Sequence, residues 1–275
     1  MEKIVIGVDV GISTTKIVGL KGGDILSPTR IKATDPVSSL YGAFGKFLHD
    51  NKVTLADVEK IMITGVGSSY INEQIYDCKT EKVEEYIADA MGAGYKSDLK
   101  DMIVISMGTG TTYVMKHGDK IQHLGGLGIG GGALQGMARV MLKTDDFSEI
   151  SSLAEKGDLS KIDLLIGDIS PTALPNLPMD ATASLFAKAQ TNTAPEDLAL
   201  GIIHLVLQSI GSGAIFASLN THIKDFVMIG HMSLFPQCKM VFPQLEQLYG
   251  VHFHIPELSL YRTAIGAALF GQNNK

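Results

Sequence analysis

The chain has 275 residues, 45% of them hydrophobic and 19% charged, with a net charge of −6 and an isoelectric point near 5.7. This is the composition of a globular protein with enough apolar material for a core. The acidic balance argues against a nucleic-acid partner, because nucleic-acid-binding proteins normally present a basic face. It does not argue against nucleotides, because small phosphates are held by local backbone groups.

The chain shows no signal for a metal cluster, a signal peptide or a membrane span. Cys78 and Cys238 are far apart and neither lies in a CxxC pattern, so no zinc or iron–sulfur site is expected within one chain. The N-terminus lacks the basic-then-apolar layout of a signal peptide. No apolar run approaches the roughly 20 residues that cross a bilayer. We therefore expect a cytoplasmic protein without a membrane partner.

The first third of the chain predicts a strand–turn–strand unit followed by helices. Residues 4–8 and 16–20 are apolar runs that predict strands on either side of a Gly/Ser/Thr turn. Leu40, Phe44 and Phe47 are spaced as on one face of a helix over residues 38–50. Further predictions are a strand at 61–64 that ends at Gly65 and a helix at 82–96 with small residues on its later turns.

The same pattern then restarts near residue 103. Strands are predicted at 102–106 and 112–116 around a second Gly/Thr turn. This imperfect duplication predicts two similar β/α lobes with a cleft between them, divided near Leu99 into residues 1–98 and 99–275. The remaining predictions are a glycine-rich stretch at 124–136, helices at 136–142, 199–219 and 261–270, a proline-rich connector at 171–178, and strands at 226–229 and 252–255.

The first turn is a candidate phosphate site. Its backbone N–H groups, its hydroxyls and a lysine are the donors that polyphosphate oxygens need. Asp9, at the end of the strand, is a candidate Mg²⁺ ligand. A plain hairpin in which Asp9 bonds its own turn fits the local composition equally well. The candidate residues are Asp9, Gly11, Ser13, Thr14, Thr15 and Lys16.

The second turn makes the plain-hairpin alternative less attractive. Two glycines and several threonines directly after a buried strand are unfavourable in a turn that has no other role, because glycine loses much conformational entropy on folding. A second phosphate-facing hairpin would complete a clamp around a triphosphate. The candidate residues are Gly108, Thr109, Gly110 and Thr111.

The third glycine stretch, residues 125–136, is the most unusual, with seven glycines in twelve positions. We expect it to form no stable regular element and to allow close approach of the backbone to a ligand. It leads into a predicted helix whose first N–H groups are candidates to face an anion. A flexible linker is the alternative, but Leu127, Ile129 and Leu134 are unusual in linkers. No stretch has the P-loop or GxGxxG pattern.

Three segments together resemble the actin-like ATPase and sugar-kinase superfamily. Residues 8–18 (VDVGISTTKIV) are similar to its first phosphate motif, residues 106–112 to its second, and residues 226–232 (FVMIGHM) to its adenosine motif. The resemblance covers most of the chain. It implies two ribonuclease-H-like lobes that close over Mg²⁺ and ATP, with Gly230 against the nucleotide.

Within that superfamily, residues 123–132 (HLGGLGIGGG) resemble the signature of type II pantothenate kinases, and residues 82–94 resemble their catalytic helix. The resemblance implies that Glu85 is the general base on the pantothenate hydroxyl, with Glu84 as second choice. A solvated charge on a helix is the alternative for either residue. The resemblance also implies a homodimer. It assigns ATP contacts to Gly130, Gly131 and Gly132, and acceptor contacts to Thr111, His123, Gly125 and Gly126.

One position departs from the family pattern. The family usually has an arginine immediately before this glycine stretch, and this chain has His123. Arginine offers a fixed charge and a planar fork of donors, whereas histidine offers fewer donors and no fixed charge. Donors of this type are worth a factor of roughly 10²–10³ in rate, so the identity of the acceptor is open at this point.

The expected activity is ATP-dependent phosphorylation of pantothenate to 4′-phosphopantothenate, the first step toward coenzyme A. Three alternatives remain. The first is an activator ATPase of 2-hydroxyacyl-CoA dehydratases, whose first phosphate motif is similar and which residues 64–67 (TGVG) also resemble. The second is a kinase of another small hydroxyl compound, such as an amino sugar. The third is a kinase-like protein that senses nucleotides or CoA esters without turnover. Feedback by coenzyme A is undecided.

Overall fold

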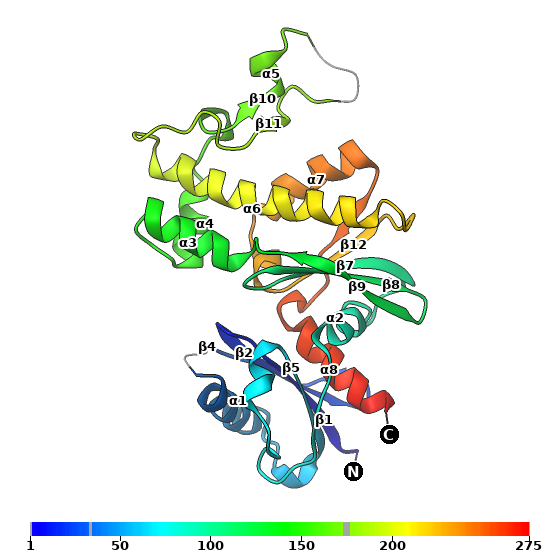
Figure 1. Cartoon of the computed structure of the whole chain (residues 1–275). Helices are drawn as coiled ribbons and strands as arrows, with labels where there is room; N and C mark the ends of the chain where they lie inside the picture. Colours follow the sequence, from blue (N-terminus) through cyan, green and yellow to red (C-terminus); the bar gives the residue numbers. More distant parts are fainter. Residues whose placement is uncertain (1, 33–34, 173–176, 275) are drawn as a thin grey trace.

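The computed structural model describes residues 2–32, 35–172 and 177–274. Two β-sheets lie in two lobes, one above the other in Figure 1, and both chain ends lie at the first lobe. The fold class predicted from the sequence, α/β with two lobes, is confirmed.

The first lobe is built on a mixed sheet with strand order β3–β2–β1–β5–β6, and β4 also pairs with β2. The hairpin β1–β2 is antiparallel, while β1–β5 and β5–β6 are parallel. Parallel pairing brings the ends of β1 and β5 to the same edge of the sheet. The strands are β1 (Ile4–Val10), β2 (Thr14–Lys21), β3 (Asp24–Ile25), β4 (Thr29–Lys32), β5 (Val58–Thr64) and β6 (Thr80–Lys82).

Helix α1 (Pro36–Asn51) covers one face of this sheet. It begins two residues before the predicted start at 38, because the Asp35 side chain accepts a hydrogen bond from the Ser38 N–H and proline occupies the first helical position. It ends at Lys52, which adopts the left-handed conformation of a helix C-cap. Its apolar face, with Phe44 and Phe47 fully buried, packs on the strands.

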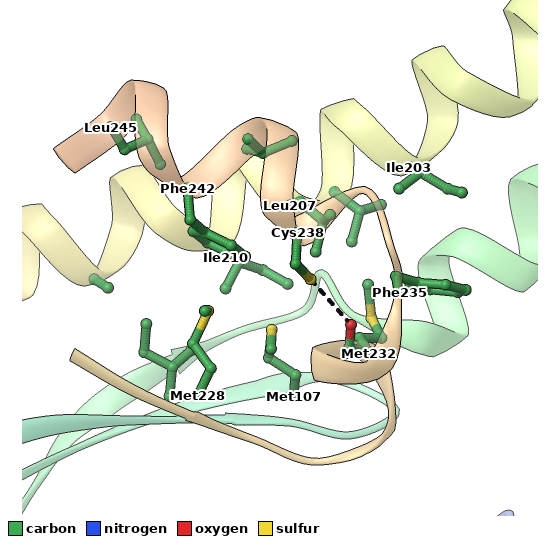
Figure 2. Packing of buried hydrophobic residues seen from close by; sticks show 14 of the residues in the cluster. Met107, Ile203, Leu207, Ile210, Met228, Met232, Phe235, Cys238, Phe242 and Leu245 are labelled. Carbon is green, nitrogen blue, oxygen red and sulfur yellow. Dashed lines mark hydrogen bonds between the residues drawn. The ribbon is translucent and has the colours of Figure 1, made fainter. Parts of the chain in front are cut away.

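The second lobe is built on a sheet with strand order β13–β12–β7–β8–β9. Its strands are β7 (Asp101–Met107), β8 (Thr111–His117), β9 (Lys120–Leu127), β12 (Asp225–Ile229) and β13 (His252–His254). Helices α3 (Gly131–Met141), α4 (Phe147–Ala154), α6 (Pro195–Ser218) and α7 (Cys238–Tyr249) pack around its core. Figure 2 shows the part of this core where Phe242 and Leu245 of α7 meet Leu207 and Ile210 of α6.

Helix α6 is long and apolar enough to cross a bilayer by length and composition alone. The expectation that no apolar run approaches spanning length is therefore wrong for this segment. In the fold, 67% of its most apolar window is buried inside the protein. Its hydrophobicity is therefore that of a core helix that packs on several elements at once.

Two helices join the lobes. Helix α2 (Glu85–Ala93) packs on the second sheet, α8 (Arg262–Asn273) packs on the first, and the two helices pack against each other. Their axes approach so closely that a Cβ at Gly92 would lie 1.8 Å from the Arg262 carbonyl oxygen, and one at Gly266 1.7 Å from the Ala88 carbonyl oxygen. Only glycine fits at such a crossing.

The division into residues 1–98 and 99–275 stays a proposal. Helix α8 comes from the C-terminal segment but packs against the first sheet, so the first lobe includes chain from both ends. A small extension of β10 (Leu164–Leu165), α5 (Ile166–Ile169) and β11 (Thr182–Ser184) rises beyond α6 in Figure 1. Asp163 anchors it, accepting hydrogen bonds from the Phe186 N–H and the Thr182 hydroxyl and lying 2.7 Å from His204 Nδ1. The predicted proline-rich connector falls here, and its residues 173–176 lie outside the described residues.

Three local predictions need correction. The helix predicted from residue 82 begins at Glu85, because Lys82 belongs to β6. The helix predicted from residue 136 begins at Gly131. The glycine stretch was expected to be irregular, yet Gly125 and Gly126 lie in β9 and Gly131, Gly132 and Gly136 in α3. Pairing with β8 and packing of α3 against α6 outweigh the low propensity of glycine for regular structure.

Candidate active site

A cleft of about 1110 Å³ lies between the lobes. It is lined by the turn between β1 and β2, the turn between β7 and β8, the start of α2, the starts of α3 and α4, and the residues after β12. Open α/β sheets bind ligands at the carboxyl ends of their strands, and β1, β7 and β12 all end here. The two glycine turns predicted to form a clamp are thus brought together in one cavity.

The first turn places charge on the cleft floor. Lys16 Nζ lies 2.8 Å from Asp9 Oδ2, and both side chains are nearly buried. Gly65, at φ 85°, backs this pair so closely that a Cβ there would lie 2.6 Å from Asp9 Oδ1. Gly11, Ser13 and Thr14 also line the cleft. Thr15, predicted to bind ATP, is fully buried and is not among the lining residues.

The second turn is fixed by backbone hydrogen bonds to the start of α3. The Gly131 N–H donates to the Gly108 carbonyl and the Gly132 N–H to the Thr109 carbonyl, both at 2.9 Å. A Cβ at Gly130 would lie 2.7 Å from that Thr109 oxygen, so glycine permits this contact. The N–H groups of Gly131 and Gly132 are therefore used within the protein and shape the cradle.

Thr111, predicted to touch both ATP and the acceptor, is also committed to the fold. Its hydroxyl donates to the Ile129 carbonyl at 2.8 Å, although the residue lines the cleft. Thr109 and Gly110 line the cleft as well, and their N–H groups donate no hydrogen bond within the described residues. These two are the backbone donors that the second turn leaves for a phosphate.

Glu85 opens α2 and faces the cleft. Its side chain is exposed to solvent in the open cleft. Protein atoms around the cleft still partly desolvate the carboxyl, and this desolvation, followed by the nearby carboxylates of Asp89 and Asp9, raises the pKa of Glu85 to about 8, while Lys16 only partly opposes the shift. A helix N-terminus by itself favours the charged form, so desolvation, with the neighbouring carboxylates second, decides the direction of the shift. Glu84, the second choice for the base, is the N-cap of α2 and lines the same cleft.

Asp89 lies one helical turn beyond Glu85 and is fully buried. Its Oδ1 accepts a hydrogen bond from the Thr263 hydroxyl at 2.7 Å, and its Oδ2 has no hydrogen-bond partner within the described residues. Burial raises the pKa of Asp89 to about 7, against the lowering effect of the Thr263 hydrogen bond. Sequence reasoning missed this residue. The one sequence feature that pointed to it is its position four residues after Glu85, one turn further along the helix.

The predicted acceptor residues are only partly brought together. His123 on β9 lines the cleft, and its ring centroid lies 6.1 Å from that of Tyr86 on α2, next to Glu85. Gly125, Gly126 and Gly130 are not among the lining residues. The assignments of these three glycines to ligands stay predictions.

The residues after β12 form the opposite end of the cleft. Gly230, at φ 94°, leads into His231, whose ring packs edge-on against Phe147 at a centroid distance of 4.8 Å. Burial, and then the charges of Arg30 and Lys16, lower the pKa of His231 to about 4, so this ring is neutral near pH 7. A neutral aromatic wall beside a strand-end glycine suits a planar base.

A magnesium ion fits the residues present. Within the described chain, no cluster of three or more His, Cys, Asp or Glu side chains is arranged to hold a metal. Mg²⁺ bound together with a nucleotide typically needs only one or two carboxylates, because phosphates and water complete its shell. Asp9, whose Oδ1 makes no hydrogen bond in the described structure, meets that requirement on the cleft floor.

A family model described as Fumble matches residues 69–240, more than half of the chain. The chain belongs to the Fumble family. A type II pantothenate kinase of Bacillus cereus strain AH820 is 26% identical over 243 residues, covering 82% of this chain and 80% of the relative. One of Staphylococcus aureus strain MRSA252 is 27% identical over 227 residues, covering 78% and 84%. The resemblance to type II pantothenate kinases is confirmed.

Solved structures of low identity share the fold. The activator of 2-hydroxyisocaproyl-CoA dehydratase from Clostridium difficile, solved with bound ADPNP, has a TM-score of 0.72 at 18% identity and covers 98% of this chain and 95% of that one. The ROK-family glucokinase from Streptomyces griseus, solved with glucose and AMPPNP, has a TM-score of 0.63 at 13% identity, with coverages of 98% and 99%. The two-lobed fold of actin-like ATPases and sugar kinases is confirmed.

Sequence reasoning missed several residues of the cleft. Arg30 and Lys32 of β4 and Phe147 at the start of α4 all line it. For β4 the available signal was the alternation of basic and apolar residues in Arg30, Ile31 and Lys32, which is typical of a half-buried strand. Phe147 follows Asp146, whose side chain caps α4 in a pattern that predicts a helix start.

Proposed function

We propose that this protein is a pantothenate kinase that transfers the γ-phosphoryl group of ATP to the hydroxyl of pantothenate, giving 4′-phosphopantothenate and ADP. The observation that carries the proposal is Glu85: a carboxyl of raised pKa that faces, across one cleft, the two glycine turns of a nucleotide-binding fold. The Fumble family match and the type II pantothenate kinase relatives support the choice of acceptor.

In this proposal the two turns hold the triphosphate from opposite lobes. Lys16 and the free N–H groups of Thr109 and Gly110 neutralise and orient phosphate oxygens. Mg²⁺, held by Asp9, supplies further neutralisation of phosphate charge. Glu85 accepts the hydroxyl proton as the acceptor oxygen bonds to the γ-phosphorus. The bond from that phosphorus to the β,γ-bridging oxygen breaks, and ADP leaves with the electron pair.

The raised pKa of Glu85 suits this role. A carboxylate whose conjugate acid has a pKa of about 8 is a better proton acceptor than an ordinary glutamate. Closure of the lobes over the substrates excludes water and protects ATP from hydrolysis. The side chains of Tyr86 and His123, beside Glu85, line the space for the acceptor.

The environment of Cys238 does not favour the activator alternative. Activators of this type use cysteines to bridge an iron–sulfur cluster between subunits, which requires accessible thiolates. Cys238 is buried in the second core, its thiol donates to the Met232 carbonyl (Figure 2), and burial raises its pKa to about 12. A core thiol of this kind is inert.

Two finer features belong to the same proposal. We propose a homodimer, supported by exposed apolar side chains at the end of α6, where Phe216 and Leu219 are 63% and 68% exposed. We propose a cytoplasmic enzyme, supported by the acidic composition and by relatives that are metabolic kinases.

A coupled ADP-release assay with Mg²⁺ and ATP tests the function. Pantothenate is compared with a panel of small hydroxyl compounds, including amino sugars, at equal concentrations. We expect ADP release to depend on pantothenate and to exceed that with the other acceptors at least tenfold. ADP release that depends on another acceptor would identify a different kinase. Tight ATP binding without release from any acceptor would favour a nucleotide sensor.

A further inference from the structure

Strand β4 brings positive charge into the cleft that neither glycine turn accounts for. It pairs antiparallel with β2, so Arg30 stands opposite Lys16 and Lys32 opposite Thr14. All four residues line the cleft, whereas Ile31, between the two basic residues, packs on the core of the first lobe. The alternation of a strand thus directs both basic side chains to the cleft side of the sheet.

A row of charged residues crosses three neighbouring strands at this point. Asp9 on β1 stands opposite Lys16 on β2, which stands opposite Arg30 on β4. Lys16 is neutralised by Asp9 at 2.8 Å. Arg30 forms no ion pair or hydrogen bond with any residue that the structure describes. Lys16 and Arg30 are like charges directly opposite on adjacent strands, which is a destabilising arrangement. The row of three residues carries one positive charge that no described acidic residue neutralises.

The other basic residues of the cleft have acidic neighbours. Arg139 on α3 lies 2.7 Å from Asp145. The pKa of Asp146, on the second lobe, is lowered mainly by its hydrogen bonds with Ser148 and weakly by the charge of Lys32 across the cleft. Within the described residues, Arg30 and Lys32 both lack an ion-pair partner, unlike Arg139, and Arg30 is the one that stands directly opposite Lys16.

Arg30 lies directly opposite Lys16 and lines the same cleft. Lys16 pairs with Asp9 near Glu85, where phosphoryl transfer is proposed to occur. At the other end of the cleft, next to Gly230 and Phe147, the pKa of His231 is lowered by burial and then by the charges of Arg30 and Lys16. A nucleotide that spans this cleft carries its α- and β-phosphates between those ends.

We propose that Arg30 is a nucleotide-positioning residue that binds the α- or β-phosphate of a nucleoside di- or triphosphate from the edge of the first sheet. The bound phosphate is then the anion that neutralises Arg30 at the end of the row Asp9–Lys16–Arg30. The inference rests on the proposed function only in taking a nucleotide as the phosphoryl donor. A guanidinium suits the role, because its planar fork matches two phosphate oxygens at once.

Isothermal titration calorimetry with ADP and, separately, with adenosine tests this proposal on the full chain. We expect Arg30→Ala to weaken ADP binding about 10- to 100-fold and to leave adenosine binding unchanged. Arg30→Lys, which keeps the charge but loses the fork, should recover part of the affinity. Lys21→Ala is the matched control: it removes one positive charge at the far end of β2, outside the cleft, and should bind ADP like the wild type.

Equal ADP affinity in Arg30→Ala and the wild type would overturn the proposal, as would equal weakening of ADP and adenosine, which indicates general damage to the site. A wild type that binds no ADP would overturn both this proposal and the kinase function. A wild type that binds ADP but phosphorylates no pantothenate would refute only the acceptor assignment, and the ADP comparison would still decide the role of Arg30.

Discussion

In the first lobe the β1–β2 hairpin brings Asp9 opposite Lys16, and in the second the β7–β8 hairpin brings Ser106 opposite Thr112. The turns differ by one residue, since Val10 pairs with Thr15 across four residues and Met107 pairs with Thr111 across three. The side chains differ as well: a charged pair in one hairpin and two hydroxyls in the other.

The surroundings of the two hairpins differ in the same sense. The first turn is closed by its own hydrogen bond, from the Gly11 N–H to the Thr14 carbonyl at 3.1 Å. The second also has its own hydrogen bond, from the Gly108 N–H to the Gly110 carbonyl at 2.9 Å, and is in addition fixed to the first turn of α3 through Gly131 and Gly132. In the proposed function the two lobes therefore contribute differently to phosphate binding: the first supplies charge and the second a rigid backbone cradle. Mutations in the two lobes should therefore fail in different ways.

The largest expected effect is the fall in kcat when the proposed general base, Glu85, is replaced. Glu85→Gln should lower kcat by about 10²–10⁴ while ADP binding stays near the wild-type value, because glutamine fills the same space without accepting a proton. Glu84→Gln, one residue earlier, is the matched control and should retain most activity. Steady-state kinetics and calorimetry check both. Full activity in Glu85→Gln would refute the assignment, and the reverse pattern would move the base to Glu84.

In the second lobe, the next expected effect is on the packing of the second glycine turn and hence on stability. Gly130→Ala places a methyl group 2.7 Å from the Thr109 carbonyl oxygen and 2.8 Å from backbone atoms of Gly110, so the second turn must shift. We expect a loss of about 1–3 kcal/mol in unfolding free energy together with weaker ADP binding. Gly128→Ala, where a Cβ has no neighbour within 4 Å, is the control and should be close to neutral. Denaturant unfolding of the two variants compares them, and similar stabilities would contradict the described packing.

A smaller effect is expected at the acceptor end. His123→Arg restores the residue usual in the family beside Tyr86 and Glu85. A fixed positive charge there should raise kcat/KM for pantothenate, by about tenfold, without changing the KM for ATP. His117→Arg, at the far end of the neighbouring strand β8, is the control. A fall in kcat/KM in His123→Arg would show that the histidine is adapted to a different acceptor.

The last prediction is a dependence of stability on pH. Asp89 has a folded-state pKa of about 7, above its unfolded value, so between those values the folded chain binds more protons than the unfolded one. The stability of the wild type should therefore decrease, through this group, as pH rises toward 7. Asp89→Asn removes the effect and should be the more stable protein at pH 8, by on the order of 2–4 kcal/mol. Unfolding free energies measured from pH 5 to pH 9 would contradict this if the difference between the two proteins did not grow with pH.

Much of the fold and part of the candidate site were predictable from the sequence. The duplicated strand–turn–strand units, the glycine after β12 at Gly230 and the helix that carries Glu85 follow from local patterns and from the family resemblance, whereas β1 runs two residues past the predicted strand end, to Val10. Propensity gave the wrong expectation for the glycine stretch, because strand pairing with β8 and packing against α6 are tertiary effects that no local pattern contains.

The charges that shape the site were the harder part. Arg30 and Asp89 lie far in sequence from the residues they meet, and only the pairing of β4 with β2 and the packing of α2 on α8 bring them to the cleft. The sequence also did not indicate that the Thr111 hydroxyl is used by Ile129 or that Thr15 is buried. These outcomes depend on which side of a strand faces the cleft.

The most direct test of the central claim is mass spectrometry of the products formed from pantothenate, Mg²⁺ and ATP by the wild type and by Glu85→Gln. The account predicts one added phosphate on pantothenate, formed in step with ADP by the wild type and nearly absent with the variant. ADP formed by the wild type without any phosphorylated pantothenate would contradict it.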